Sequence, residues 1–367
     1  MTPNTSAVST ASAPHGAGRW ADELWQAVAC ADEYTATGVV LHALEQTLDP
    51  EGVLLDLIAP VQGKVGEEWA ANRLTVAQEH AATAINDRAV AALSLHPVAR
   101  TSVERPGRIT VACVDGEWHA LPARILAEVL KLRGWQVDYL GAQVPTPHLI
   151  AHLHRTNCDA VALSSSIATR LPTAHAAITA CQAVGVPVLV GGAAFGTDGR
   201  YARLLGADAW APDARAAAEL LVRTPLSRPH PHHQAIDDLP HLADQEYTMV
   251  ARSGRALVRA VFSKLETAFP AMRDYSELQR EHTAADLAHI VEFLGIALYT
   301  GDEDLFTDFL TWTAGILTAR DVPAHSLPPA LRFLAAELKD FPRATRIVQL
   351  GAERLTLSSL TTAGSTA

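Results

Sequence analysis

A histidine and two carboxylates follow the first strand-like run of the chain, and these residue types can bind a metal. The run covers residues 109–114, and Asp115, Glu117 and His119 come shortly after it. Open α/β sheets bind their ligands at the carboxyl ends of parallel strands, so His119 would face a ligand there. Imidazole ligates transition metals, and Asp115 or Glu117 can bond its second nitrogen and fix its tautomer. We therefore predict that His119 is a metal ligand, with Trp118 beside it.

Small residues end two later strand-like runs, and they predict room for a large ligand. Glycine lets a backbone approach a ligand closely, because it has no side chain in the way. Small hydroxyl side chains at a strand end leave similar space. The residues that would contact the tail of a large planar ligand are Ser164, Ser166, Gly191 and Gly192.

A tryptophan and a Glu-His pair lie upstream in the spacing Trp-x9-Glu-His, at Trp69, Glu79 and His80. A tryptophan on a bundle helix is most often a core residue, and a Glu-His pair on a helix is most often exposed. A carboxylate is also a suitable partner for ribose hydroxyls. The residues alone leave both interpretations open.

The size and charge of the chain restrict its function. Its 367 residues predict two or three domains of roughly 100–200 residues each. The net charge of −11 argues against a nucleic-acid surface, and no apolar run predicts a membrane helix. The cysteines show neither metal spacing nor a disulfide framework, so we expect a cytoplasmic protein. They are Cys30, Cys113, Cys158 and Cys181.

The first part of the chain is predicted to be helical. We expect a disordered tail over residues 1–18 and a four-helix bundle over residues 19–98. Pro50 stands near the start of the third helix, where its missing N–H costs little. Thr75 and Gln78 predict a capping box at the start of the fourth helix.

The rest of the chain makes the predicted fold multidomain, with α and α/β parts. Residues 105–224 alternate strands and helices, which predicts a doubly wound, flavodoxin-like parallel sheet. The strands are expected at 108–114, 135–140, 159–164, 186–190 and 207–210. A Pro- and His-rich segment over 225–240 reads as a linker, with metal binding as the less favoured interpretation. Residues 241–355 predict a second helical domain of four helices, globin-like or a bundle, followed by a tail over 356–367.

The segment 105–224 resembles a cobalamin-binding domain. The family pattern is Asp/Glu-x-His-x-x-Gly, then Ser-x-Leu, then Gly-Gly. This chain has Glu117-Trp118-His119-Ala120-Leu121-Pro122, then Ser164-Ser165-Ser166, then Gly191-Gly192. Pro122 replaces the family's glycine and Ser166 replaces its leucine. The resemblance implies base-off binding, in which His119 is the axial ligand of cobalt and the dimethylbenzimidazole of the cofactor enters the sheet.

The Trp-x9-Glu-His element resembles the CarH-type adenosylcobalamin photoreceptors. The resemblance implies that Trp69 covers the adenosyl group and that Glu79 and His80 cap it by hydrogen bonds. Members whose light state has a second histidine on cobalt carry it directly after the tryptophan, where this chain has Ala70. That adduct is therefore excluded, and His80 is the alternative after a rearrangement. We find no helix-turn-helix counterpart before Trp20 and expect no direct contact with nucleic acid.

The segment 241–355 carries polar and aromatic residues that suit a second chromophore. Histidine and aspartate suit pyrrole nitrogens, and arginines pair with propionates. The candidates on one helix face are His282, Asp286 and His289. Those on the preceding helix are Arg252, Arg255 and Arg259, and the aromatic candidates are Tyr299, Phe309 and Trp312. A plain dimerisation bundle, or a haem bound by His282 or His289, is the alternative.

The order of bundle, corrinoid sheet and C-terminal helical domain resembles the photocobilins, which combine cobalamin with biliverdin. Since no cysteine follows Cys181, a biliverdin there would be bound non-covalently. We expect a light sensor rather than an enzyme, forming a light-dependent dimer or tetramer and signalling to an unknown partner without a membrane. The alternatives are a corrinoid carrier of a methyltransferase system and a cobalamin-only photoreceptor with a C-terminal interaction domain.

Overall fold

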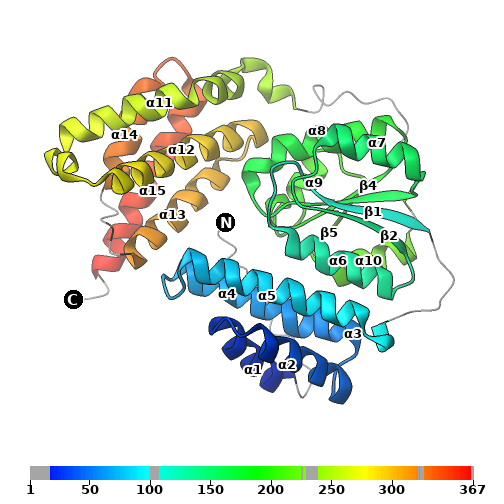
Figure 1. The fold of residues 1–367 in the computed structure, drawn as a ribbon. Helices are drawn as coiled ribbons and strands as arrows, with labels where there is room; N and C mark the ends of the chain where they lie inside the picture. Colours follow the sequence, from blue (N-terminus) through cyan, green and yellow to red (C-terminus); the bar gives the residue numbers. More distant parts are fainter. Residues whose placement is uncertain are drawn as a thin grey trace. The chain divides into compact units, whose positions relative to one another are not determined.

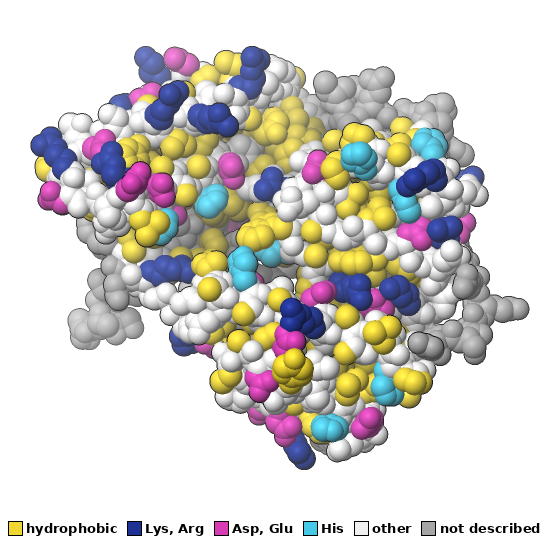
Figure 2. All heavy atoms as spheres, in the orientation of Figure 1, with side chains coloured by type: hydrophobic (Ala, Val, Ile, Leu, Met, Phe, Trp, Pro, Cys, Tyr) yellow, Lys and Arg dark blue, Asp and Glu magenta, His cyan; other side chains and the backbone are white. Residues whose placement is uncertain are grey.

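The computed structural model describes residues 17–99, 107–224, 226–228, 239–320, 322 and 326–364. These residues form two compact units, one ending at residue 228 and the other beginning at residue 239 (Figure 1). Most of the predicted linker lies outside the described residues. On the face shown in Figure 2, side chains of both charges are scattered over both units. None of the described helices is both long and apolar enough to cross a bilayer.

The first unit begins with a helical bundle. Its helices are α1 (Ala17–Ala29), α2 (Glu33–Gln46), a continuous stretch from α3 (Pro50–Gly52) to α4 (Ala59–Ala70), and α5 (Val76–Leu95). Asp49 caps the stretch that starts with Pro50, because its carboxylate accepts from the Gly52 amide at 2.6 Å. The capping box of Thr75 and Gln78 at the start of α5 is confirmed.

A π-helical segment, Val53–Ile58, joins α3 to α4 without a break. The Ala59 amide donates to the Leu54 carbonyl, five residues back instead of four. The widened turn directly precedes Pro60, whose ring would clash with the Asp56 carbonyl in a regular α-helix. The wider turn therefore lets the helix continue through the proline.

The second part of this unit is a five-stranded parallel sheet in the order β2-β1-β3-β4-β5. The strands are β1 (Arg108–Cys113), β2 (Gln136–Gly141), β3 (Ala160–Ser164), β4 (Val188–Gly191) and β5 (Ala209–Ala211). The helices between and after them are α6 (Ala120–Leu132), α7 (Thr146–Thr156), α8 (Leu171–Ala183), α9 (Arg200–Leu204) and α10 (Ala214–Arg223). Helices cover both faces, with α6 and α10 on one side and α7 and α8 on the other (Figure 1). The predicted flavodoxin-like, doubly wound sheet is confirmed, and the strand order reverses between β1 and β3.

The bundle and the sheet share one core. A single cluster of buried apolar side chains runs from Leu24 and Leu57 of the bundle to Ile109 and Leu130 of the sheet module. Arg133, the residue that follows α6, also forms a two-pronged ion pair with Glu51, at 2.7 and 2.9 Å. Apolar burial holds the two parts together, because an exposed ion pair contributes only ~1 kcal/mol or less.

The second unit is entirely helical in its described residues. Its main helices are α11 (Glu246–Ala268), α12 (Glu277–Thr300), α13 (Glu303–Ala319), α14 (Leu327–Glu337) and α15 (Pro342–Gly364). Gly301 ends α12 in the left-handed conformation, as its position between two apolar stripes predicts. The sequence predicted four helices here and missed α15, which extends past residue 355. Buried Glu246 accepts from the Arg343 and Ala344 amides at 3.1 and 2.8 Å and so caps α15 from another helix.

Candidate functional site at the carboxyl edge of the sheet

His119 lies in the loop after β1 and is fixed by a fully buried carboxylate. Its Nδ1 lies 2.6 Å from Glu117 Oε1, and its backbone amide donates to the same oxygen at 2.9 Å. An ionised carboxylate only accepts hydrogen bonds, so Nδ1 carries a proton, and in the neutral imidazole Nε2 then keeps its lone pair. A lone pair on Nε2 is what a metal ligand needs. Of the two carboxylates considered from the sequence, Glu117 is the one that holds His119.

Glu117 also ties the loop after β1 to the loop after β3. Its Oε2 accepts from the Ser166 amide at 2.6 Å, the Ile167 amide at 3.1 Å and the Ser165 hydroxyl at 3.2 Å. Burial by itself raises the pKa of Glu117, but the hydrogen bonds from His119 and Ser166 outweigh it and lower the pKa to about 2. The carboxylate is therefore charged near neutral pH and orients His119.

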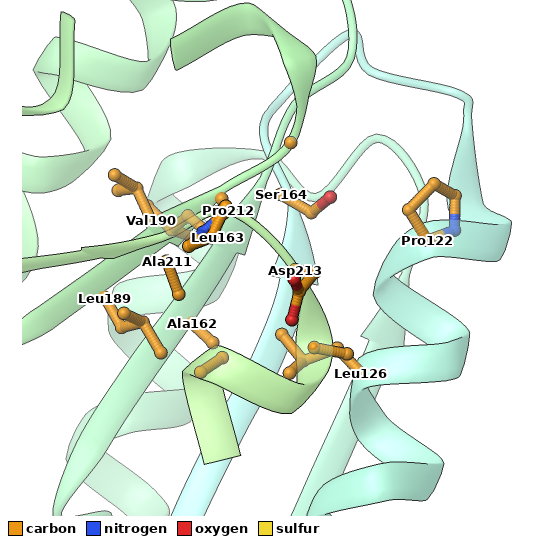
Figure 3. Close-up of a pocket in the computed structure, with 14 residues that line it drawn as sticks. Pro122, Leu126, Ala162, Leu163, Ser164, Leu189, Val190, Ala211, Pro212 and Asp213 are labelled. Carbon is orange, nitrogen blue, oxygen red and sulfur yellow. The ribbon is translucent and has the colours of Figure 1, made fainter. Parts of the chain in front are cut away.

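A cavity of about 110 Å³ opens at the ends of β3, β4 and β5, between α6 and α10 (Figure 3). Ser164, Gly191 and Gly192 line it, as do Pro122 and Asp213. The remaining lining residues are small or aliphatic: Leu126, Ala162, Leu163, Leu189, Val190, Ala211, Pro212, Ala214 and Ala217. The contact of these residues with a ligand tail stays a prediction, but they surround a space at the expected place.

Two of the small residues also lie against neighbouring backbone, and one of them, Gly192, has a conformation that requires glycine. Gly192 has φ +98°, and a Cβ there would lie 2.3 Å from the Ser165 carbonyl oxygen. A Cβ on Gly191 would lie 3.3 Å from the Ala211 carbonyl oxygen. Ser166 contributes its backbone amide to Glu117, a role that its side-chain type did not predict.

The residues predicted above the cofactor lie on the bundle side of this edge. Glu79 and His80 are in the first turn of α5, and His80 Nδ1 lies 2.7 Å from Glu79 Oε2. The His80 ring meets Trp118 edge-on at a centroid distance of 5.8 Å, and Trp118 lies 5.1 Å from the His119 ring. The structure thus brings His80 and His119 to the same indole. Trp69, near the end of α4, is half-buried against the bundle core.

Sequence reasoning missed Asp213 and Leu126 as neighbours of the site. Asp213 caps α10 by accepting from the Ala216 amide at 2.8 Å, and it projects toward the space between Ser164 and Leu126 (Figure 3). Its position after β5 was a usable signal, since the carboxyl ends of all five parallel strands share one edge. Leu126 carries no such signal, because an apolar residue on a helix most often marks core.

In the second unit, the three polar candidates of α12 lie on one helix face. Burial raises the pKa of Asp286, and the charges of His289, His282 and Arg320 oppose that rise. Both histidines are exposed, whereas Asp286 is half-buried. Arg320 at the end of α13 was missed from the sequence. The arginines expected to join this group, Arg252, Arg255 and Arg259, are exposed on α11.

The aromatic candidates of the second unit separate into two pairings. Phe309 stacks on Phe293 at 3.8 Å, with the ring planes 5° apart, and Trp312 lies 6.3 Å from Phe309. Tyr299 is buried and packs edge-on against Tyr247 at 4.8 Å. Phe309 and Trp312 are therefore neighbours, with Phe293 as a partner that the sequence did not indicate.

Known proteins match the first unit of this chain. A model of the B12 binding domain matches residues 107–222, and a second model with the same description matches residues 20–94. The HTH-type transcriptional repressor CarH of Myxococcus xanthus is 31% identical over 187 residues, which are 49% of this chain and 60% of that protein. Dimethylamine corrinoid protein 1 of Methanosarcina acetivorans is 28% identical over 204 residues, covering 53% of this chain and 94% of that protein.

A solved structure matches the same region. The monomethylamine corrinoid protein of Methanosarcina barkeri superposes with a TM-score of 0.50 at 18% identity, covering 56% of this chain and 98% of that one. This likeness shows the fold of a helical cap on a five-stranded parallel sheet. The fixed His119, the cavity and both matching models agree on one cofactor class. Through residues 20–94 and 107–222, the chain belongs to the family of B12-binding proteins.

Proposed function

We propose that the protein is a light-sensing photoreceptor that holds adenosylcobalamin between the bundle and the sheet, with His119 as the lower axial ligand. The observation that carries this proposal is the meeting of His80 and His119 at Trp118. Through Trp118, the Glu79–His80 pair of the bundle comes near His119 of the sheet, the histidine proposed to bind cobalt. A similar CarH repressor supports the sensor class.

The residues of the site fit this cofactor. The Glu117 carboxylate leaves the lone pair of His119 Nε2 available to cobalt. The cavity beside Ser164 and Gly192 is lined by small and aliphatic side chains, which suit an aromatic base of a nucleotide tail inserted into the sheet. When bound, adenosylcobalamin supplies a cobalt–carbon bond that visible light breaks.

The upper residues are proposed to read the state of the cofactor. In the dark, Trp69 would pack on the adenosyl group, and Glu79 and His80 would hydrogen-bond its polar atoms. Loss of that group in light would remove these contacts, so the bundle would no longer favour the dark arrangement. A ligand shifts a conformational equilibrium only through different affinities for the two states, and these contacts provide that difference. The signal would pass through a changed dimer or tetramer interface to a separate cytoplasmic partner, with no enzymatic step, membrane or nucleic acid involved.

We further propose that the second unit is a globin-like domain that binds biliverdin without a covalent bond. The cluster of Asp286 with His282, His289 and Arg320 provides partners for pyrrole nitrogens and a propionate. Half-buried Trp312 offers aromatic surface beside the buried Phe309, and exposed Arg259 adds a second positive charge on α11. No cysteine follows Cys181 to form a thioether.

A corrinoid carrier is the second candidate. The observation in its favour is coverage, since the match spans 94% of a dimethylamine corrinoid protein but 60% of CarH. A carrier transfers a methyl group and gains nothing from bonding an adenosyl ribose. The Glu79–His80 pair at the face of the bundle therefore favours the sensor.

The test is a dark incubation of the purified protein with biliverdin and either adenosylcobalamin or methylcobalamin, followed by desalting and spectra before and after green light. Wild type should retain adenosylcobalamin in preference and change its corrinoid spectrum in light, while His119→Ala should bind weakly or base-on. His148→Ala, an exposed histidine of α7, is the control. Equal retention of both corrinoids would favour the carrier function. Loss of biliverdin on desalting would contradict the proposal that the second unit binds it.

A further inference from the structure

A line of polar side chains runs through the bundle and ends on Glu79. Asn86 is fully buried and donates from Nδ2 to Gln62 Oε1 at 2.8 Å. Gln62 donates from Nε2 to Thr83 Oγ1 at 2.8 Å, and the Thr83 hydroxyl donates to Glu79 Oε1 at 3.1 Å. The line therefore crosses from α5 to α4 and back to α5.

The direction of every hydrogen bond in this line is determined, because the ionised Glu79 carboxylate can only accept. The Thr83 oxygen accepts from Gln62, so its one proton goes to the Glu79 carboxylate. The other carboxylate oxygen faces His80 Nδ1 at 2.7 Å, which puts a proton on Nδ1 and, in the neutral ring, leaves the lone pair on Nε2. Each bond thus points toward Glu79, and both carboxylate oxygens are held.

Stability does not explain this polar line. The Oδ1 atom of Asn86 is buried without a hydrogen-bond partner, which costs free energy of folding. Its neighbours Ala82, Ile85 and Ala89 show that the same helix packs well with apolar side chains. The spacing of Glu79, Thr83 and Asn86, four and three residues apart, puts all three on one face of α5. Fixing the direction of the Glu79 carboxylate is a function that would explain why the chain keeps this destabilising arrangement.

We infer that Gln62, Thr83 and Asn86 are positioning residues that make the upper face of the corrinoid site selective for an adenosyl group over a methyl group. The inference rests on the proposed function, because it assigns Glu79 and His80 to the adenosyl group. A carboxylate held in one direction can accept from ribose hydroxyls, whereas a methyl group offers it no hydrogen bond. Rotation of the Glu79 side chain would therefore weaken the binding of adenosylcobalamin and leave the binding of methylcobalamin unaffected.

The test compares Thr83→Val, which keeps the shape but removes the hydroxyl, with Thr83→Ser, which keeps the hydroxyl. Dissociation constants for adenosylcobalamin and methylcobalamin are measured in the dark on the full chain. Thr83→Val should raise the dissociation constant of adenosylcobalamin about tenfold, the size expected for one charge-assisted hydrogen bond. It should raise that of methylcobalamin by less than about twofold. Thr83→Ser should restore the wild-type ratio. Ser94→Ala is the control, because that hydroxyl bonds only a carbonyl of its own helix at 2.8 Å.

A second measurement uses the protein without cofactor. Nitrogen chemical shifts of the His80 ring should show the Nδ1-protonated tautomer in wild type and Thr83→Ser, and a more mixed population in Thr83→Val. If Thr83→Val does not fold by circular dichroism, Gln62→Met removes the preceding bond at similar side-chain length and should give the same selectivity loss.

The outcomes separate the two proposals. A wild type that binds both corrinoids equally overturns the adenosyl assignment and this inference with it. A wild type that prefers adenosylcobalamin, with Thr83→Val keeping that preference, overturns only the positioning role. An equal loss of both corrinoids in Thr83→Val also overturns it, since Thr83 would then serve the bundle fold alone.

Discussion

At the scale of single residues, the chemistry of His119 depends on the side chain two positions before it. Glu117 accepts hydrogen bonds from both the ring and the amide of His119, and from three groups of the loop after β3. One carboxylate therefore sets the tautomer of His119 and holds two strand ends together. The sequence could name Glu117 as a candidate, but the partners from the other loop could not be read from spacing.

The depressed pKa of Glu117 predicts a pH dependence of the unfolding free energy. The folded-state pKa of about 2 lies below the ordinary 4.5, so the unfolded chain binds the proton more tightly. The resulting stabilisation, about 3 kcal/mol, is complete above the ordinary value and is lost as the pH falls toward about 2. Denaturant unfolding of the cofactor-free protein should show this loss.

Glu117→Gln is the matched variant, since it keeps the shape and cannot titrate in this range. It should be less stable than wild type at neutral pH, because its amide group would face backbone donors. The gap between the two proteins should narrow as the pH falls from about 5 to about 2. Parallel curves over that range would contradict the hydrogen-bonded, charged carboxylate.

At the scale of elements, most strands were predictable because they are short apolar runs between turn residues, whereas β2 carries the polar Gln136 and Asp138. The buried β3, Ala160–Ser164, lies inside the predicted 159–164, and β1 ends one residue before the predicted end. The edge strand β5 is shorter than predicted, since only Ala209–Ala211 pairs with β4. Helix α15 was missed although its buried residues Ala344, Ile347, Val348 and Leu355 recur at helical spacing. Its cap, Glu246, comes from a distant part of the sequence, and local spacing cannot show such a partner.

The capping box of α5 predicts a link between helix stability and the site. Thr75→Ala removes the side chain that accepts from the Gln78 amide and should lower the unfolding free energy by about 1 kcal/mol. Because Glu79 and His80 lie in the same first turn, fraying there should also weaken adenosylcobalamin binding. Ser276→Ala removes an equivalent capping box on α12 of the other unit and is the control. Ser276→Ala should lower the unfolding free energy by a similar amount and leave the cobalamin affinity unchanged. If Ser276→Ala weakened cobalamin binding as much as Thr75→Ala does, the effect would not come from the first turn of α5.

At the scale of the whole molecule, the chain divides into two units that each have their own core. The residues proposed to contact cobalamin all lie in the first unit, and those proposed for biliverdin all lie in the second. The sequence predicted both groups, but it could not show that His80 and Trp118 meet, because that contact joins two separate elements of the fold.

This division predicts that the two cofactors can be separated. A fragment of residues 1–228 should bind adenosylcobalamin with an affinity within a few-fold of the full chain, and one of residues 239–367 should bind biliverdin alone. Absorption spectra after desalting measure both. Failure of the first fragment, when folded by circular dichroism, would mean that the second unit completes the corrinoid site.

The π-helical segment Val53–Ile58 bears on how relatives of this chain should be compared. A residue in an α-helix advances the direction of its side chain by about 100°, so one residue more or less in that segment turns everything after it by the same angle. Trp69 follows in the same continuous helix. Two relatives can therefore share the Trp-x9-Glu-His spacing and still point the tryptophan in different directions, if only one of them has the wide turn. Counting residues backward from Trp69 to the start of its helix, as well as forward to Glu79, tells the two cases apart.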